Sequence, residues 1–412
     1  MKKIIFLALI SVSFIQAESI LIKSGTILDG SGENPFKADI LIDGARIIEI
    51  GSGINESKAD RLIDASDKIV TPGLISPISN IGVVEINALD VTTDDESSIY
   101  GPGFSIFYAF NPNSTLIPWN KSNGVTSAIS TPGYSNEIFK GMGSYFLLDG
   151  KYDITGLQDI AMYARIGNVQ GSRSENIQLM ESMLLLAQKL NSDNISELLD
   201  DNLASSFGLL EQDIIALNKV ALGELPIVIE VNRAADILQA LRLKNIFNLD
   251  MILMSVEEAP LIIQQIKESG VPVIIDPMDN IPNSFDELAS DIKLGGILDK
   301  NGIKVMFSTQ RSHNYHLMRQ GAGNAVAHGM SYKNAIRGMT LTVAETFKLK
   351  DRGQIKKGNY ADIVIWTEDP LEQMSYPLSV LINGEIQDLT TRSDRLTERY
   401  INSNDLPKAY IH

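Results

Sequence analysis

The sequence predicts an α/β protein in which a barrel of alternating strands and helices is inserted into a small β-domain formed by both ends of the chain. The chain has 412 residues, 44% hydrophobic and 21% charged, which is enough for a large buried core and one appendage. Short β-branched runs with Asp-Gly or Asn-Gly turns occur near both ends. Between them, apolar runs alternate with helical patterns, as in parallel βα units.

Composition and charge exclude several classes of protein. The absence of Cys excludes a disulfide framework, a thiolate-bound iron–sulfur cluster and a zinc finger, and only four His are present to bind a metal. Lys and Arg number 35 against 51 Asp and Glu, giving a formal net charge of -16. Such a charge repels nucleic acids and anionic lipid surfaces, so we expect neither as a partner.

The first 17 residues predict a secretory signal peptide. Lys2 and Lys3 precede an apolar run at 4–15, and Ala17 supplies a small residue at the cleavage site. The apolar run of about twelve residues is shorter than the roughly 20 needed to span a bilayer, and no later run is long enough. We expect an exported, periplasmic protein, cleaved near Ala17 and without a membrane span.

Strand-like runs at the two ends define the β-domain. The first part contains runs at 20–23, 38–42 and 46–50, with a turn at Asp43-Gly44. The last part contains runs at 361–366 and 380–386, the second with a turn at Asn383-Gly384. Because paired chain ends make an insertion easy, we expect a β-domain of residues 18–71 and 347–400 around a barrel of residues 72–346.

The barrel region has its own strand and helix signals. Four apolar runs predict strands: 124–130, 226–229, 271–275 and 303–307. Capping-box patterns at 172–175 and 255–258 predict the starts of two helices, the second of which ends at Gly270. Ser331 is positioned to cap the last helix of the barrel.

Two segments at the junctions carry a family resemblance. Residues 69–75 read IVTPGLI, and residues 351–364 read DRGQIKKGNYADIV and are followed by Asp369-Pro370-Leu371. In this order, about 280 residues apart, they resemble the amidohydrolase superfamily, where the first segment leads into the first barrel strand and the second returns to the β-domain. The exported, imidazolonepropionase-like amidohydrolases are the most similar in pattern.

This resemblance implies a (β/α)8, TIM-like barrel inserted in a small β-sandwich domain. It also implies metal-dependent hydrolysis of C–N bonds in cyclic amides or dipeptide-like substrates. In that family a divalent metal lowers the pKa of bound water, and an Asp after the eighth strand takes its proton. The metal ligands are an HxH pair on the first strand, a carboxylated Lys or a Glu, and two later histidines.

The residues that match these positions in the family differ in this chain. The family pattern TPGxIDxHxH is replaced by TPGLISPISN, so Ser76, Ile78 and Asn80 stand for the acid and the two histidines. The later histidines would fall at Glu230 or Asn232 and near Ser255, and the catalytic Asp becomes Gln310. Isoleucine has no lone pair for a metal, and an amide cannot exchange protons at neutral pH. The sequence assigns no particular Lys to the carboxylated position.

We favour a non-catalytic binding or accessory homologue without a metal cofactor. Polar side chains at the C-terminal ends of the strands would bind a small polar or peptide-like molecule. They are Ser79, Asn80, Glu230, Asn232, Gln310 and Arg311. An active amidohydrolase paralogue is a further expected partner. Oligomeric state, including a homo-oligomer, and ligand identity are left open.

The alternative is an active hydrolase of C–N bonds with a rebuilt site. Glu230 would be its base, or zinc or manganese would be bound by His313 and His316 with carboxylates from the loop after the first strand. Those carboxylates are Glu85, Asp90, Asp94 and Asp95.

Glu230 is the candidate catalytic residue, and a buried carboxylate needs either a cation or a raised pKa. Arg173, Arg233 and Arg311 are the expected cations. A ligand-binding or general-base role and a structural ion pair both fit this pattern.

Overall fold

The computed structural model describes residues 18–401 apart from 87–88, 134–136, 168, 170, 192 and 310. The expected signal peptide at residues 1–17 therefore lies outside the described residues. Among the described helices, none is both long and apolar enough to cross a membrane.

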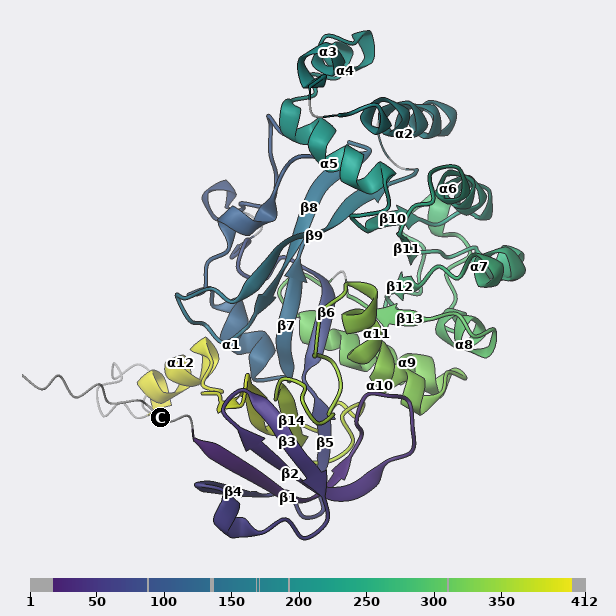
Figure 1. The fold of residues 1–412 in the computed structure, drawn as a ribbon. Coiled ribbons are helices and arrows are strands. Elements are labelled where there is room, and N and C mark those ends of the chain that lie inside the picture. The colour runs from purple at the N-terminus through teal and green to yellow at the C-terminus, as the bar shows by residue number, and fades with distance from the viewer. Residues whose placement is uncertain are drawn as a thin grey trace, which may run out of the picture.

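One sheet is built from both ends of the chain, as predicted (Figure 1). Its strands are β1 (Ser19–Ile27), β2 (Phe36–Asp43), β3 (Arg46–Gly51), β4 (Arg61–Asp64), β5 (Ile69–Pro72), β14 (Ile363–Trp366), β15 (Pro377–Ile382) and β16 (Glu385–Ile386). Their order is β16-β15-β14-β5-β1-β2-β3, with β4 paired to β1. The antiparallel β5–β14 pair joins the two parts of the chain. The domain boundaries themselves stay predictions.

The junction between this sheet and the barrel is closely packed around Trp366. The indole is fully buried, and its Nε1 donates a hydrogen bond of 2.9 Å to Thr71 Oγ1 on β5. Gly124 lies against the same ring with a φ of +92°, and a Cβ there would come within 2.4 Å of it. Only glycine fits, because both the space and the backbone conformation exclude a side chain.

The second sheet forms a nearly closed barrel in the order β13-β12-β11-β10-β9-β8-β7-β6. Its strands are β6 (Leu74–Ser79), β7 (Val125–Ser130), β8 (Phe139–Leu147), β9 (Gly156–Arg165), β10 (Ile227–Val231), β11 (Met251–Ser255), β12 (Val273–Ile275) and β13 (Val305–Phe307). The end strands β6 and β13 contact each other. This architecture confirms the predicted α/β barrel with a separate terminal sheet.

One barrel strand runs against the others. β8 is antiparallel to both β7 and β9, whereas the other neighbours are parallel. The short connections at 131–138 and 148–155 cannot carry the crossover of a dozen or more residues that a parallel pair requires. The uniform βα alternation predicted from the sequence is therefore interrupted at β8.

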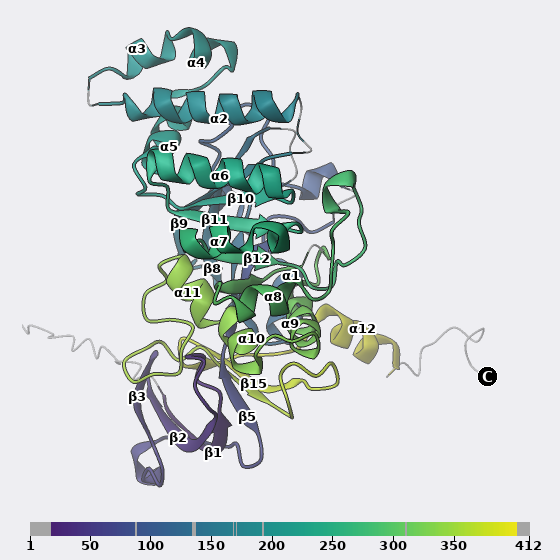
Figure 2. The same ribbon diagram turned by 90° about the vertical axis from the view of Figure 1, so that its right-hand side faces the viewer.

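Helices cover the outside of the barrel, and α2, α6, α7 and α8 are stacked along it in Figure 2. The α-helices are α1 (Leu116–Lys121), α2 (Arg173–Gln188), α3 (Ile195–Leu199), α4 (Asn202–Ser206), α5 (Glu211–Ala221), α6 (Ala234–Phe247), α7 (Ile263–Ser269), α8 (Leu294–Lys300), α9 (Met318–Ala327), α10 (Tyr332–Gly338), α11 (Leu341–Thr346) and α12 (Arg392–Ile401). Short 3-10 helices occur at Glu56–Lys58, Asp90–Thr92, Ile106–Ala109, Ala259–Ile262, Phe285–Glu287 and Tyr315–Leu317.

The predicted helix ends have mixed outcomes. Ser172 and Glu175 form the predicted capping box of α2, and Gly270 ends α7 with a φ of +66°. The second predicted capping box is wrong, because Ser255 is the last residue of β11, with a φ of +76°, and α7 begins only at Ile263. Ser331 does precede α10, but without a side-chain capping bond.

Candidate functional site

A cavity of about 440 Å³ opens where the barrel strands end. Residues at or just beyond the C-terminal ends of β6, β7 and β9–β13 line it, namely Ile78, Asn80, Thr131, Arg165, Glu230, Met254, Ser255, Ile274, Asp276, Ser308 and Thr309. Lys140 joins them from the start of β8, because this antiparallel strand has its N-terminal end at the mouth. Asp95 and Tyr315 are contributed by loops.

Three largely buried charged side chains meet on one side of the cavity, and we call them the charged cluster: Lys140, Arg165 and Glu230. Arg165 Nε lies 2.9 Å from Glu230 Oε2, and its Nη2 lies 2.6 Å from Oε1. Lys140 Nζ lies 3.1 Å from Oε2. All three side chains are at most 15% exposed. Glu230 and Arg165 are register partners on neighbouring strands, which is why their side chains meet.

The protonation preferences of the cluster follow from burial and mutual charge. Burial alone would raise the pKa of Glu230, but the charges and hydrogen bonds of Lys140 and Arg165 outweigh it and lower that pKa. Burial lowers the pKa of Lys140, and the charge of Arg165 adds to this effect, while Glu230 opposes it. Glu230 is thus held as a carboxylate between two cations.

These partners differ from those predicted for Glu230. Its cations are Lys140 and Arg165, not Arg233, Arg311 or Arg173. Arg173 instead bonds to Asp236 and Asp286. The prediction was wrong because the contact is set by the pairing of β9 with β10 and by the reversal of β8, neither of which the sequence indicates.

A hydrogen-bonded chain lies in the same cavity, and we call it the Asn80 network: Tyr315, Asn80 and Asp95. The Tyr315 hydroxyl donates to Asn80 Oδ1 at 2.8 Å, and Asn80 Nδ2 donates to Asp95 Oδ2. Burial raises the pKa of Asp95 to about 6, helped by the charges of Glu96 and Asp94. Burial also raises the pKa of Tyr315 to about 12. This network contains one group that titrates near neutral pH.

The other predicted ligand-binding residues lie in different places. Ser79 is buried, and its hydroxyl donates to the Ile129 carbonyl at 3.0 Å. Arg311 is exposed, and Gln310 lies outside the described residues. Asn232 lines an adjoining cavity, and its buried Oδ1 has no hydrogen-bond partner within the described residues. Of the six residues, Asn80 and Glu230 are therefore placed together at the main cavity.

The adjoining cavity, of about 340 Å³, is strongly acidic. Arg165, Glu230, Ser255 and Asp276 line both cavities, so the two are continuous. Glu257 stands among the acidic residues of the second one, and burial with the charges of Glu287 and Asp279 raises its pKa to about 8.

The two candidate metal-binding histidines do not reach the main cavity. His316 is buried beside Asn120, with Nδ1 3.3 Å from the amide oxygen, and burial lowers its pKa to about 4. The Nε2 of His313 is buried and has no hydrogen-bond partner in the described part of the chain. Within the described residues, no group of three or more His, Asp or Glu side chains lies close enough together to hold a metal ion.

The donor set at the mouth does not fit the divalent metal that the resemblance implies. Ile78 offers no donor atom, and Asn80 directs its amide nitrogen at Asp95. Both oxygens of Glu230 are already bound by cations. A metal ion beside Glu230 would meet two positive charges and a carboxylate whose two oxygens are already bound.

Lys140, Arg165 and Tyr315 were missed from the sequence. Arg165 did have a signal, because it is a charged residue directly after the apolar run at 160–164, as expected at a strand end facing a barrel mouth. Lys140 had no such sequence signal, because it lies at the start of its strand. Only the reversed direction of β8 brings it to this end of the barrel.

Comparison with known proteins agrees with this architecture. Residues 228–388 match the model of the amidohydrolase family. An amidohydrolase from Thermotoga maritima MSB8 is similar in structure, with a TM-score of 0.78 and 21% identity over 89% of this chain and 99% of the other. Molinate hydrolase has a TM-score of 0.56 and 16% identity over 91% and 96%. A prolidase complexed with N-methylphosphonate-L-proline has the same TM-score and identity over 89% and 99%.

No curated protein matches the chain in a sequence search. The family model nevertheless covers the barrel from β10 onward and the return into the terminal sheet, and the solved structures share the whole fold. Residues 228–388 are therefore similar to the amidohydrolase family, and the chain shares its fold with these solved structures.

Proposed function

We propose that this chain is a non-catalytic member of the amidohydrolase superfamily that binds a small polar or peptide-like molecule at the barrel mouth. The observation that carries the proposal is the position of two cations. Lys140 and Arg165 line the same cavity as Ile78 and Asn80, the residues that stand where the HxH histidines would be. Two internal cations thus line the cavity in which the sequence resemblance would place a metal.

Electrostatics supports the loss of metal-dependent hydrolysis. A divalent ion needs several lone pairs and a net negative surrounding, but the only carboxylate of the charged cluster is shared between a guanidinium and an ammonium. Adding an ion would require breaking these bonds inside a buried site, where an uncompensated charge is costly.

The loss of a general base supports the same conclusion. Glu230 was the candidate base of a rebuilt site, yet its lowered pKa makes it too weak a base to activate a water molecule for hydrolysis at neutral pH. The position of the family's catalytic Asp is taken by Gln310, and an amide does not exchange protons under these conditions.

Retained binding is supported by the shape and chemistry of the mouth. Its volume of about 440 Å³ lies within the range typical of small-molecule sites. The cavity presents donors and acceptors of both charge signs from several strands and loops. Two expectations from the sequence accompany this proposal: export to the periplasm and association with an active paralogue.

Metal analysis tests the non-catalytic part of the proposal. The full chain, produced with added zinc or manganese and then dialysed, should contain well below one equivalent of either metal by inductively coupled plasma mass spectrometry. A metal-dependent amidohydrolase prepared in parallel is the positive control. One equivalent per chain, removed by a chelator together with hydrolysis of cyclic amides or dipeptides, would overturn the proposal.

Ligand screening tests the binding part. Small polar and peptide-like compounds should include some that raise the melting temperature of the wild-type protein. The same compounds should have a weaker effect on Asn80→Ala, because its side chain lines the cavity. The proposal fails if no compound stabilises the wild type, or if the variant responds equally to all of them.

A further inference from the structure

Lys140 is a buried lysine whose amine faces a cavity. Its side chain is 11% exposed, and Nζ lies 3.1 Å from Glu230 Oε2 at the mouth of the barrel. A lysine is normally placed at the surface, where water stabilises its charge. Burial beside a space large enough for a small molecule is a frequent setting of nucleophilic lysines.

Two neighbouring side chains, Arg165 and Glu230, favour reactivity of the Lys140 amine. Arg165 places a second positive charge on the same carboxylate, which disfavours the ammonium form of Lys140. Glu230 receives the Lys140 hydrogen bond and is therefore positioned to take its proton and return it.

A second buried lysine shows that burial alone is not the distinguishing feature. Lys121 is 7% exposed, and burial lowers its pKa as well. Its Nζ donates to Gln387 Oε1 at 3.1 Å, and it does not line the mouth cavity. Lys121 thus shares the burial of Lys140, but it lies outside the mouth cavity and its hydrogen bond goes to an amide, while the charges of Asp149 and Asp388 act on it from further away.

We propose that Lys140 is a carbonyl-reactive amine, which captures a small aldehyde or ketone in the mouth as an imine on Nζ. This rests on the proposed function, because it uses the same cavity and names the chemical class of the molecule bound there. Metal-dependent hydrolysis forms no imine on a lysine, and nothing in the capture requires a metal.

The reaction balances with the groups present. Glu230 takes one proton from the ammonium, and the neutral amine attacks the carbonyl carbon. The new N–C bond forms as the C=O π electrons move to oxygen, which receives the proton back from Glu230. Loss of a second N–H proton to Glu230 gives the carbinolamine, whose hydroxyl leaves as water with that proton. The sum is ammonium plus carbonyl to iminium plus water, without oxidant or reductant.

Reductive trapping on the full chain tests the proposal. The protein is incubated at neutral pH with pyruvate or with propanal and sodium cyanoborohydride, which reduces an iminium to a stable amine. Peptide mass mapping should find the adduct on Lys140 at a rate at least about tenfold above the mean for exposed lysines, because the cavity holds amine and carbonyl together. The two probes distinguish an anionic from a neutral carbonyl ligand.

Matched controls come from the chain itself. Lys140→Arg keeps the positive charge but cannot form an imine, so the adduct should disappear. Lys121 should label no faster than exposed lysines in the same wild-type digest. Site assignment in the wild type decides the question even if Lys140→Arg folds poorly.

Failure would be distinguishable from failure of the proposed function. If neither probe labels Lys140 faster than exposed lysines, imine capture is wrong, while non-covalent binding detected by thermal shift would stand. If one equivalent of metal and hydrolysis are found, the proposed function is wrong whatever the trapping result.

Discussion

The two sides of the barrel mouth hold their polar side chains in different ways. On the side of β8, β9 and β10, the charged cluster balances a buried carboxylate against two cations. On the side of β6, the Asn80 network uses hydrogen bonds between an amide, a phenol and a carboxyl group. The first depends on permanent charges, and the second depends on a carboxyl whose pKa is raised to about 6. Substitutions on the two sides should therefore change the free energy of unfolding by different amounts and with a different dependence on pH.

The largest effect is expected from Glu230→Gln. Removing the carboxylate leaves two buried cations beside each other, so the free energy of unfolding should fall by about 3–5 kcal/mol. Urea unfolding at neutral pH measures this change. Cyanoborohydride trapping on Lys140 should also slow, because the proton acceptor is lost.

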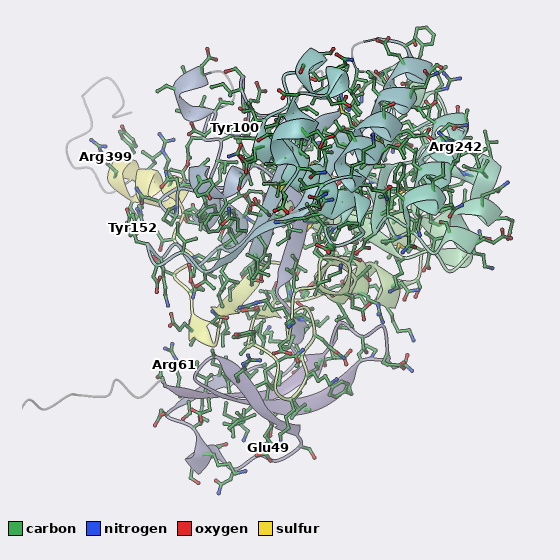
Figure 3. The ribbon with its side chains drawn as sticks, turned by 45° about the horizontal axis from the view of Figure 1, so that its top comes forward. Glu49, Arg61, Tyr100, Tyr152, Arg242 and Arg399 are labelled. Carbon is green, nitrogen blue, oxygen red and sulfur yellow. The ribbon has the colours of Figure 1, made fainter. Side chains whose placement is uncertain are left out.

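Glu49→Gln is the matched control for this change. Glu49, labelled in Figure 3, lies on β3 of the terminal sheet and pairs with Lys58 at 2.7 Å. Because both side chains of that pair are more than 40% exposed, we expect a loss of about 0–1 kcal/mol. Equal effects of the two substitutions would contradict the account of the charged cluster as a buried, mutually dependent group.

Asp95→Asn should stabilise the protein at neutral pH by about 1–3 kcal/mol. A carboxyl whose folded pKa is raised from 3.8 to about 6 favours the neutral form in the folded state. The protonated Asp95 carboxyl therefore contributes to the stability of the folded protein below pH 3.8, and this contribution is lost as the pH rises to about 6. The substitution removes that loss while keeping an oxygen that can accept the Asn80 hydrogen bond.

Unfolding free energies measured from pH 4 to 8 check this sign. Glu257, with a pKa raised to about 8, is present in both proteins, so the difference between them isolates Asp95. The difference should grow between pH 4 and 6 and then level off. A constant difference across this range would contradict a titrating Asp95.

Comparing Arg165→Met with Lys140→Met separates the two cations of the cluster. Arg165 makes two hydrogen bonds to Glu230 and Lys140 makes one, so the arginine substitution should cost about 1 kcal/mol more in unfolding free energy. Urea unfolding of both variants at neutral pH measures the difference. Equal costs, or a larger cost for the lysine substitution, would mean that the two bonds of Arg165 do not anchor the carboxylate.

Much of the fold followed from the sequence, because it depends on local periodicity and on the junction segments. The strands at β7, β10, β12 and β13 and the capping box of α2 are present where predicted. The direction of β8 was not predictable from its own residues, since a strand has the same period in either direction and only the short connections set its orientation.

The site was predicted only in part, for the same reason. Asn80 could be placed at the mouth because it immediately follows a strand that a motif identifies. The partners of Glu230 could not, because they depend on strand register and on β8. The raised pKa of Asp95 depends on burial by loops, which no local pattern reports.

The smallest effect is expected from Tyr315→Phe, which removes the hydroxyl that donates to Asn80 Oδ1. The loss should be about 0.5–1.5 kcal/mol and constant from pH 4 to 8, because the pKa of Tyr315 is raised to about 12. Combined with Asp95→Asn, it should be non-additive, since both residues bond to the same amide. Combined with Lys140→Met, across the mouth, it should be additive. If Tyr315→Phe were coupled to Lys140→Met but not to Asp95→Asn, the mouth would not divide into a charged cluster and a separate Asn80 network.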